Sequence, residues 1–381
     1  MNAATSKTFF VRLKAGLTAG NYNSIINITS EGAESKTVTC SGEVLPGLIT
    51  EHPSTDGQTI CLGATANTLS VTATGNGLTY QWYSNTAQSN EGGLLIEGAS
   101  NSSYTPSTAL AGTLFYYVVV SEADNSVTSN VSGAVIVKGY SGGDGTEGNP
   151  FQIATLDDLK FLSENDCHWD KYFIQTSYID ASATSSWNGG SGFSPIGYYG
   201  KFFTGSYYGD GNVISGLTIN RVEQLSEKSQ GMFGATENAN LGGICLWNVN
   251  INASVSGSTG GLVGEAIKST IIESFVTGTV NGSSFVGGLV GQLTDHSLIS
   301  ECFTTCVVTG TTDNIGGLAG ISYNESGIFD SYATGQVTGN SYVGGLVGKN
   351  GYADPSFIRH SYATGLVTGI SNTGGLVGYN D

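Results

Sequence analysis

The chain has 381 residues, and at about 100–200 residues per domain this length suggests two or three domains. Only 11% of the residues are charged, 57 are glycine, and the sequence holds no apolar run of about 18 residues, no heptad repeat and no Gly-X-Y period, which argues against a membrane-spanning helix, a coiled coil and collagen. Thirteen basic residues stand against 30 acidic ones, and a net charge of −17 makes nucleic acid and anionic membrane surfaces poor partners.

Residues 1–46 are predicted to be the C-terminal strands of a partial β-sandwich. Three runs rich in β-branched and aromatic residues, Thr8–Lys14, Tyr22–Ser30 and Lys36–Val44, are separated by turns that contain glycine. The segment Val11–Tyr22 resembles the final strands of β-sandwich modules in large surface proteins of the Bacteroidetes. Because three strands cannot cover both faces of a sheet, we expect the preceding strands to belong to a longer parent protein.

Residues 47–138 are predicted to form a second β-sandwich. Cys61, then Trp82, then the strand Phe115–Val120 resemble an immunoglobulin-like domain, and Tyr80–Tyr83 is the most specific part of that resemblance. The late strand carries no cysteine, so the inter-sheet disulfide of the family does not carry over. Trp82 is therefore expected to pack against Tyr and Val side chains.

Residues 139–149 are predicted to be a glycine-rich linker, and one short helix is expected after it. Thr155 can cap this helix, and Asp157 and Asp158 fall in its first turn, where the helix dipole favours acids. Its apolar face consists of Leu156, Leu159, Phe161 and Leu162.

Residues 150–381 contain an internal repeat. The phrase Gly-Gly-Leu-Val-Gly, with one Ala for Val, starts at Gly260, Gly287, Gly316, Gly344 and Gly374, at spacings of 27, 29, 28 and 30 residues. A second phrase recurs in step with it at Ser274–Gly278, Cys302–Cys306, Ser331–Gly335 and Ser361–Gly365. A fixed period of this size indicates stacked structural units that bury Leu and Val against one another. The glycine pairs are expected at tight corners, where a Cβ would clash or where φ is positive.

These phrases resemble the GLUG-motif repeats of bacterial surface proteins, and the segments Gly145–Leu159 and Phe203–Ile219 resemble the region that precedes such repeats. The resemblance implies a right-handed parallel β-solenoid of about 28 residues per coil, capped by the short helix. The whole chain is thus predicted to be all-β, with one partial sandwich, one immunoglobulin-like sandwich and a solenoid. The chain stops directly after a Gly-Gly-Leu-Val-Gly phrase, so we expect the solenoid to continue in the parent protein.

No catalytic motif accompanies the repeats. GLUG repeats also occur in some immunoglobulin-A-cleaving metallopeptidases, but those need a His-Glu-x-x-His zinc helix, which this sequence lacks. A Gly-x-Ser-x-Gly nucleophile elbow between a strand and a helix is absent too. The sequence therefore predicts a chain that is not an enzyme.

Stacking of the coils should turn repeated positions into rows of side chains. One row, here called the acidic row, comprises Glu273, Glu301, Asp330 and His360, each directly before the second phrase. Neighbours would lie about 4.8 Å apart, near the ~5–5.5 Å carboxylate separation of retaining glycosidases, or could recruit Ca²⁺. The simpler interpretation is a solvated row with no ligand. No cofactor other than Ca²⁺ is expected.

A second row, here called the aromatic row, comprises Phe275, Phe303, Tyr332 and Tyr362. If it is exposed, it offers a platform of the kind that stacks on sugar rings. If it is buried, it fills one corner of the solenoid, and its strict repetition favours this packing role.

These observations favour a fragment of a secreted or cell-surface adhesin-like protein. Its sandwiches would act as spacers, and its solenoid as a stalk or binding element for glycans or for host and extracellular matrix proteins. A purely structural stalk and a polysaccharide-active β-solenoid enzyme are the alternatives. No membrane insertion is expected in this segment, and the sequence shows neither a signal peptide nor an anchor.

Overall fold

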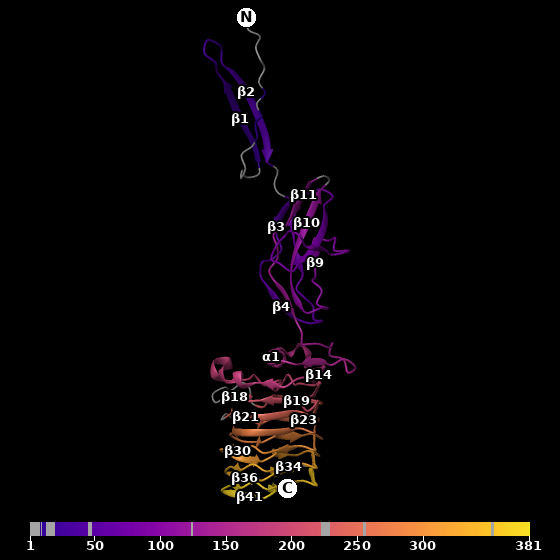
Figure 1. The fold of residues 1–381 in the computed structure, drawn as a ribbon, viewed down its shortest axis with the longest axis vertical. Helices are drawn as coiled ribbons and strands as arrows, with labels where there is room; N and C mark the ends of the chain where they lie inside the picture. The colour runs from indigo at the N-terminus through magenta and orange to yellow at the C-terminus, as the bar shows by residue number, and fades with distance from the viewer. Residues whose placement is uncertain are drawn as a thin grey trace. The chain divides into compact units, whose positions relative to one another are not determined.

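A computed structural model of the chain describes residues 8, 10–12, 20–44, 48–122, 125–221, 229–253, 257–351 and 354–381. The chain divides into two compact units, Met1–Lys138 and Gly139–Asp381, and each is described by itself. Both units are built from strands, with a few short helices in the second (Figure 1). The all-β prediction is confirmed.

The first unit begins with a two-stranded antiparallel hairpin. Strands β1 (Gly20–Ile28) and β2 (Lys36–Val44) pair along their whole length, and Gly32 in the turn adopts a φ of 80°. They correspond to two of the three strand-like runs in this region. Of the third run, Thr8–Lys14, the structure describes Thr8 and residues 10–12, and these carry no strand.

A β-sandwich follows the hairpin within the first unit. Its larger sheet has the order β4 (Gln58–Cys61), β12 (Val135–Lys138), β10 (Gly112–Glu122), β7 (Thr79–Asn85) and β8 (Leu94–Leu95), with β11 (Asn125–Thr128) paired to β10. The smaller pairs are β3 (Ile49–Glu51) with β6 (Thr72–Ala73), and β5 (Leu69–Ser70) with β9 (Ser103–Tyr104).

Trp82 lies at the centre of this sandwich and is fully buried. It belongs to one apolar cluster with Tyr116 and Val118, and its ring centroid lies 5.9 Å from that of Tyr104. Its indole Nε1 donates a hydrogen bond of 2.9 Å to the carbonyl oxygen of Asn101, which satisfies the one polar atom of the side chain. The tryptophan therefore packs against Tyr and Val, as the sequence predicts.

The second unit starts with a cap that contains the predicted helix. Helix α1 (Leu156–Glu164) begins at Thr155, whose Oγ1 accepts a hydrogen bond of 3.1 Å from the Asp158 amide. The Asp158 carboxylate in turn accepts from the Thr155 amide at 2.9 Å, which completes a capping box. Leu159 and Leu162 are fully buried, so the apolar face of α1 covers the start of the solenoid core.

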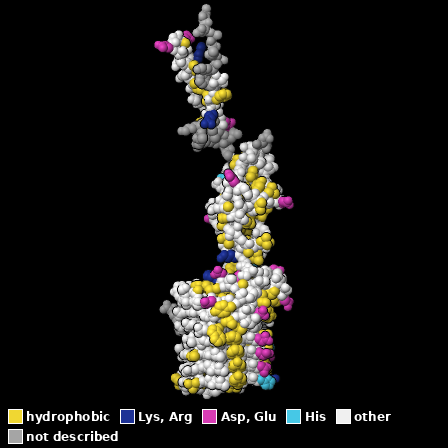
Figure 2. Space-filling model, viewed as in Figure 1, with side chains coloured by type: hydrophobic (Ala, Val, Ile, Leu, Met, Phe, Trp, Pro, Cys, Tyr) yellow, Lys and Arg dark blue, Asp and Glu magenta, His cyan; other side chains and the backbone are white. Residues whose placement is uncertain are grey.

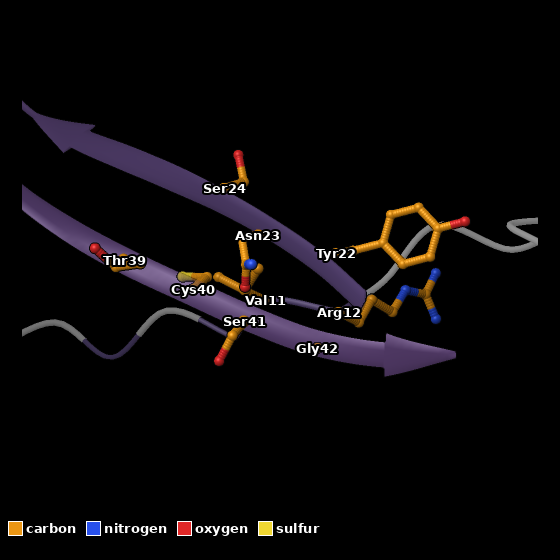
Figure 3. A pocket seen from close by; sticks show the side chains of 9 residues that line it. All are labelled: Val11, Arg12, Tyr22, Asn23, Ser24, Thr39, Cys40, Ser41 and Gly42. Carbon is orange, nitrogen blue, oxygen red and sulfur yellow. The ribbon is translucent and has the colours of Figure 1, made fainter. Parts of the chain in front are cut away.

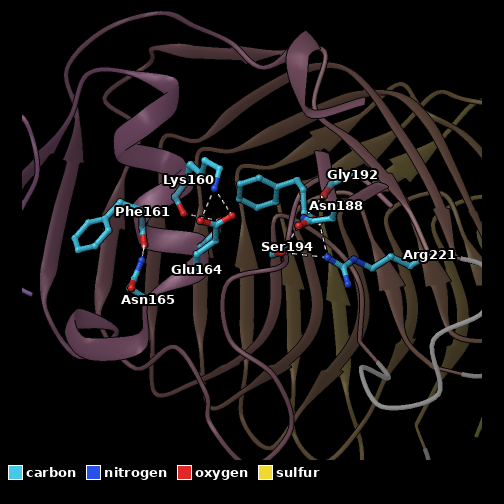
Figure 4. A network of polar contacts seen from close by, with 10 residues as sticks. Lys160, Phe161, Glu164, Asn165, Asn188, Gly192, Ser194 and Arg221 are labelled. Carbon is cyan, nitrogen blue, oxygen red and sulfur yellow. Dashed lines mark hydrogen bonds and ion pairs between the residues drawn. The ribbon is translucent and has the colours of Figure 1, made fainter. Parts of the chain in front are cut away.

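Polar contacts tie the rest of the cap together around the segment that follows α1 (Figure 4). This part contains the 3₁₀ helices η1 (Asp166–His168) and η2 (Ser182–Gly190). The buried Arg221 guanidinium donates to the Phe193 carbonyl oxygen at 3.3 Å and to Ser194 Oγ at 3.2 Å. Asn188 donates to Ser194 Oγ as well, at 3.2 Å. These contacts fix the loop that contains Asn188, Phe193 and Ser194 to Arg221 at the start of the solenoid.

The remainder of the second unit is a parallel β-solenoid with four sheets. The first sheet contains β13 (Phe151–Ile153), β14 (Tyr172–Gln175), β16 (Ser206–Tyr208), β20 (Asn240–Gly242), β24 (Thr270–Ile272), β28 (Leu298–Ser300), β33 (Gly327–Phe329) and β38 (Phe357–Arg359). The second contains β15 (Ile179–Asp180), β17 (Val213–Ser215), β21 (Cys245–Ala253), β25 (Phe275–Gly282), β29 (Phe303–Thr304), β34 (Tyr332–Ala333) and β39 (Tyr362–Ala363), with β18 (Thr218–Asn220), β30 (Val307–Gly310), β35 (Val337–Thr338) and β40 (Val367–Thr368) alongside.

The third sheet contains β22 (Thr259–Gly260), β26 (Val286–Gly287), β31 (Asp313–Gly316), β36 (Ser341–Gly344) and β41 (Ser371–Gly374). The fourth contains β19 (Phe233–Glu237), β23 (Val263–Ile267), β27 (Val290–Thr294), β32 (Ala319–Ser322), β37 (Val347–Asn350) and β42 (Val377–Asn380). The coils from β19 onwards contribute to all four sheets, and the later ones place two short strands in the second sheet. The coils stack from the cap towards the C-terminus (Figure 1). The predicted parallel solenoid is confirmed.

The Gly-Gly-Leu-Val-Gly phrase forms the turn between the third and fourth sheets. The leucines of its first four copies, Leu262, Leu289, Leu318 and Leu346, point inward and are fully buried, whereas Leu376 in the last coil is 39% exposed. Its glycines lie where neighbouring coils approach closely: a Cβ added to Gly288 would lie 2.2 Å from the carbonyl oxygen of Gly317. The glycines of these phrases do not have positive φ. Close approach between coils, and not a left-handed backbone, therefore requires glycine here.

Candidate binding surface

The aromatic row lies on the second sheet of the solenoid, with its four residues in register. Phe275 pairs with Phe303, Phe303 with Tyr332, and Tyr332 with Tyr362. Successive ring centroids are 4.9, 5.0 and 4.9 Å apart, and the ring planes are inclined by 14°, 6° and 6°. The spacing is that of parallel strands, because one ring is presented by each coil.

The rings of this row are neither buried nor open on their faces. Phe275, Phe303 and Tyr332 are half-buried, and Tyr362 is 51% exposed. Face-to-face stacking covers both faces of Phe303 and Tyr332, so ring edges meet the solvent. The expected burial is therefore wrong for this row, and a sugar ring that needs a free aromatic face does not find one on its inner members.

The acidic row lies beside the aromatic row, at the corner between the first and second sheets. Glu273, Glu301, Asp330 and His360 are all exposed and all have left-handed backbone conformations, with φ of 49°, 54°, 47° and 50°. The last two members of the row are in contact, since His360 Nδ1 lies 3.4 Å from Asp330 Oδ1. Figure 2 shows a column of acidic side chains on the solenoid next to a column of hydrophobic ones.

The residue after each member of the acidic row explains how the chain turns this corner. Ser331 Oγ accepts a hydrogen bond of 3.1 Å from the Cys302 amide and donates one of 2.6 Å to the Phe329 carbonyl oxygen. Ser274 makes the same pair of contacts in an earlier part of the repeat: its Oγ accepts from the Ile244 amide of the preceding coil and donates to the Ile272 carbonyl oxygen of its own coil. These buried hydroxyls join successive coils where the strand ladder is interrupted.

The acidic row has the chemistry of a solvated surface. Neither of two hollows on the solenoid, of about 400 and 460 Å³, is lined by Glu273, Glu301 or Asp330. Within the described part of the chain, no group of three His, Cys, Asp or Glu side chains is arranged to hold a metal ion. Exposed like charges are screened by salt, so the row can exist without a bound cation.

The larger of these two hollows contains candidate functional side chains that the sequence does not single out. It lies on the fourth sheet and the adjoining corner, and its lining includes Glu265, Gln292, Phe285, Ser258 and Ser284. Burial raises the pKa of the Glu265 carboxyl, a hydrogen bond from Ser229 opposes the rise, and Asp295 adds to it. A usable signal was present in the sequence: the residue after each Gly-Gly-Leu-Val-Gly phrase varies from coil to coil.

A further hollow of about 740 Å³ lies on the hairpin of the first unit (Figure 3). Its lining includes Arg12, Tyr22 and Cys40, and Figure 3 shows both strands along it. Among the described residues, two strands form this sheet, and several apolar side chains on it are exposed, for example Ile25 at 61%. Such a hairpin lacks the packed layers that fix the walls of a binding site.

Two family models match parts of the chain. A domain of unknown function, DUF8696, matches residues 52–138, and the GLUG motif matches residues 339–368. The second match covers the coil that contains β36, β37 and β38. The chain therefore carries the GLUG motif that the repeated phrases predict.

Three relatives illustrate the similarity to known proteins. Halomucin from Haloquadratum walsbyi is 31% identical over 310 residues, which is 69% of this chain and 3% of halomucin. Immunoglobulin A1 protease from Streptococcus sanguinis is 29% identical over 217 residues, 50% of this chain and 12% of the protease. The corresponding protease of Streptococcus pneumoniae is 28% identical over 153 residues, 36% of this chain and 8% of the protease. The chain thus spans a small part of the length of each.

A solved structure of IgA1 protease is also similar, with 15% sequence identity and a TM-score of 0.40 over 79% of this chain and 27% of that chain. In the described residues, no helix is both long and apolar enough to cross a membrane.

Proposed function

We propose that this GLUG-motif chain is part of a secreted or cell-surface adhesin-like protein and has no catalytic role of its own. The β-sandwich acts as a spacer, and the solenoid presents repeated side chains to glycans or to host and extracellular matrix proteins. Immunoglobulin A1, which the names of several relatives give as their substrate, is found outside cells, and this supports an extracellular location.

The observation that carries the proposal is the repetition, in four successive coils, of a pair made of one exposed side chain and one aromatic ring that is at least partly exposed. Each acidic-row residue stands two positions before an aromatic-row residue, as in Glu301 and Phe303. Both members reach the solvent, and the pair recurs at the strand spacing. A surface with a regular repeat can engage a repetitive polymer at several points at once, and multivalent contact turns weak single contacts into useful affinity.

A binding array tests this proposal. The chain of residues 1–381 is applied to immobilised glycans and extracellular matrix proteins, with and without Ca²⁺. A matched variant carries Glu273→Gln, Glu301→Gln and Asp330→Asn, which remove charge at exposed positions and leave the core unchanged. We expect specific binding that weakens in the variant. The absence of binding in both conditions would contradict adhesion through this chain.

A purely structural stalk is the second candidate, and the face-to-face stacking of the aromatic row favours it. Rings that cover one another stabilise adjacent coils without a ligand. This candidate predicts a silent array together with a loss of stability when the aromatic row is interrupted.

A further inference from the structure

We propose that the hollow around Glu265, here called the Glu265 hollow, is a binding site for a carbohydrate of one or two sugar rings. This site is separate from the two rows and goes beyond the proposed function. Its volume of about 460 Å³ falls in the range of small-molecule sites. It lies on one flank of the solenoid, bounded by strands β23 and β27 and by the turn that carries Tyr199.

The floor of the Glu265 hollow consists of planar polar side chains on adjacent strands. Glu265 and Gln292 are paired in register, both are half-buried, and both face outward from the fourth sheet. Ser229 Oγ donates to Glu265 Oε2 at 3.4 Å, and Tyr323 Oη donates to Gln292 Oε1 at 3.3 Å. These contacts orient the carboxylate and the amide, which can each hold two neighbouring hydroxyl groups of a sugar.

The walls add hydroxyl groups and two aromatic rings. Ser258 and Ser284 line the hollow along with Ser229. Tyr199 is 73% exposed, and its turn is closed by two hydrogen bonds of 2.9 Å between Tyr198 and Lys201. Phe285 is half-buried beside the floor. Tyr199 also contacts Phe202 edge to face, with ring centroids 6.0 Å apart. Aromatic rings next to several donors and acceptors are the composition that suits a polyhydroxylated ring.

The backbone at Phe285 gives a second, independent indication of function. Phe285 has a φ of 52°, which is unfavourable for a bulky side chain. Further along the same row of corners lie Asn314 and Asn372, with φ of 62° and 49°, and asparagine tolerates this conformation. Tyr342 also occupies this row, but its ring packs on Tyr379 at 5.3 Å. Phe285 has no ring partner among the described residues, and strained residues of this kind concentrate at ligand sites.

The lining favours a neutral polyol over a cation. An ammonium group is a hydrogen-bond donor only, so it would leave the donors of the hollow without a partner. The serine hydroxyls and the amide of Gln292 each act as donor and acceptor, which matches sugar hydroxyls. An alkylammonium ligand is therefore the competing outcome of the test.

The repeats supply substitutions that the fold already accepts. Phe285→Asn introduces the residue found at positions 314 and 372, and Gln292→Ile introduces the residue found at position 321, the next rung of the same strand ladder. Tyr342→Asn is the matched control, because it makes the same change of corner residue outside the hollow. Thermal unfolding verifies that each variant is folded.

The experiment measures binding of the methyl glycosides of glucose, galactose and N-acetylglucosamine to residues 1–381 by saturation-transfer difference NMR. Millimolar affinity is expected for ligands of this size. Phe285→Asn and Gln292→Ile should each weaken it by about tenfold, and Tyr342→Asn should leave it unchanged. No binding of any of the three sugars, binding that the two variants do not affect, or binding of n-butylamine in their place would each overturn the proposal. Array binding lost only in the acidic-row variant would support adhesion without this site.

Discussion

Phe303 and Tyr332 stack face to face across two coils of the solenoid, with ring centroids 5.0 Å apart and planes inclined by 6°. Phe303 also stacks on Phe275, at 4.9 Å. One ring therefore contacts the coil before it and the coil after it. In a solenoid, stability comes mainly from such contacts between neighbouring repeats.

The first prediction concerns this stack. Phe303→Ala removes two ring contacts and partly buried apolar area, and should lower the free energy of unfolding by about 2–3 kcal/mol. Phe303→Tyr is the control, because tyrosine occupies the same row at Tyr332, and should change stability by less than about 0.5 kcal/mol. Urea denaturation measures both. A loss of under about 0.5 kcal/mol in the alanine variant would assign the row no packing role.

A second prediction follows from the left-handed corner at Glu301, where φ is 54°. Glycine adopts this conformation without strain, so Glu301→Gly should stabilise the chain by about 0.5–1 kcal/mol. Thr305→Gly, at another exposed position of the same coil whose φ is not positive, should instead destabilise it by a similar amount. Thermal and urea unfolding of the two variants measure the difference in sign. Equal effects of the two changes would contradict backbone strain at this corner.

The glycines of the repeated phrase and the left-handed corners of the coils separate what the sequence predicts about the fold from what it does not. The period of the Gly-Gly-Leu-Val-Gly phrase predicts the stacked coils and the inward leucines, because both depend on repetition alone. The sequence leaves two reasons for the glycine pairs open, and the structure decides for close approach, as at Gly288. The sequence does not reveal that Glu, Asp and His occupy left-handed positions. Asp and His are enriched at positive φ relative to other non-glycine residues, but Glu is not, and non-glycine residues adopt it only in a few per cent of cases, so propensity does not identify the corner.

The acidic and aromatic rows and the Glu265 hollow also differ in how far the sequence predicts them. The alignment of Phe275 to Tyr362 can be predicted, since repeated positions must stack. The degree of exposure depends on how far each ring leans from the sheet, and periodicity says nothing about that. The hollow depends on a turn distant in sequence, which brings Tyr199 beside Glu265. A contact between a repeat and a non-repeated loop leaves no periodic pattern to detect.

A third prediction tests the buried hydroxyl that joins coils at the corner. Ser331→Ala leaves the buried Cys302 amide without its acceptor, and should cost about 1–3 kcal/mol. Ser331→Cys should cost less, because Cys302 itself occupies this position one coil earlier and its thiol lies 3.2 Å from the Ser300 carbonyl oxygen. Urea denaturation compares the two variants. If both lose the same stability, volume and not hydrogen bonding determines the residue at this corner.

The last prediction concerns the pH dependence that Glu265 introduces. Burial raises its pKa above the unfolded value, so the folded state binds the proton more tightly than the unfolded state does. The protonated carboxyl contributes to the stability of the fold, and this contribution is complete below the unfolded pKa. It is lost as the pH rises through the folded pKa, so the ionised carboxyl destabilises the fold at pH 7.

Glu265→Gln, which introduces the side chain of Gln292 in the next coil, should therefore raise the melting temperature at pH 7. The gain in melting temperature should vanish near pH 4, where the Glu265 carboxyl is largely protonated in both the folded and the unfolded state. Thermal unfolding at the two pH values measures this difference, with Asp330→Asn as the control for removal of an exposed acid. A gain from Glu265→Gln that is the same at both pH values would show that the carboxyl is not destabilised by its surroundings.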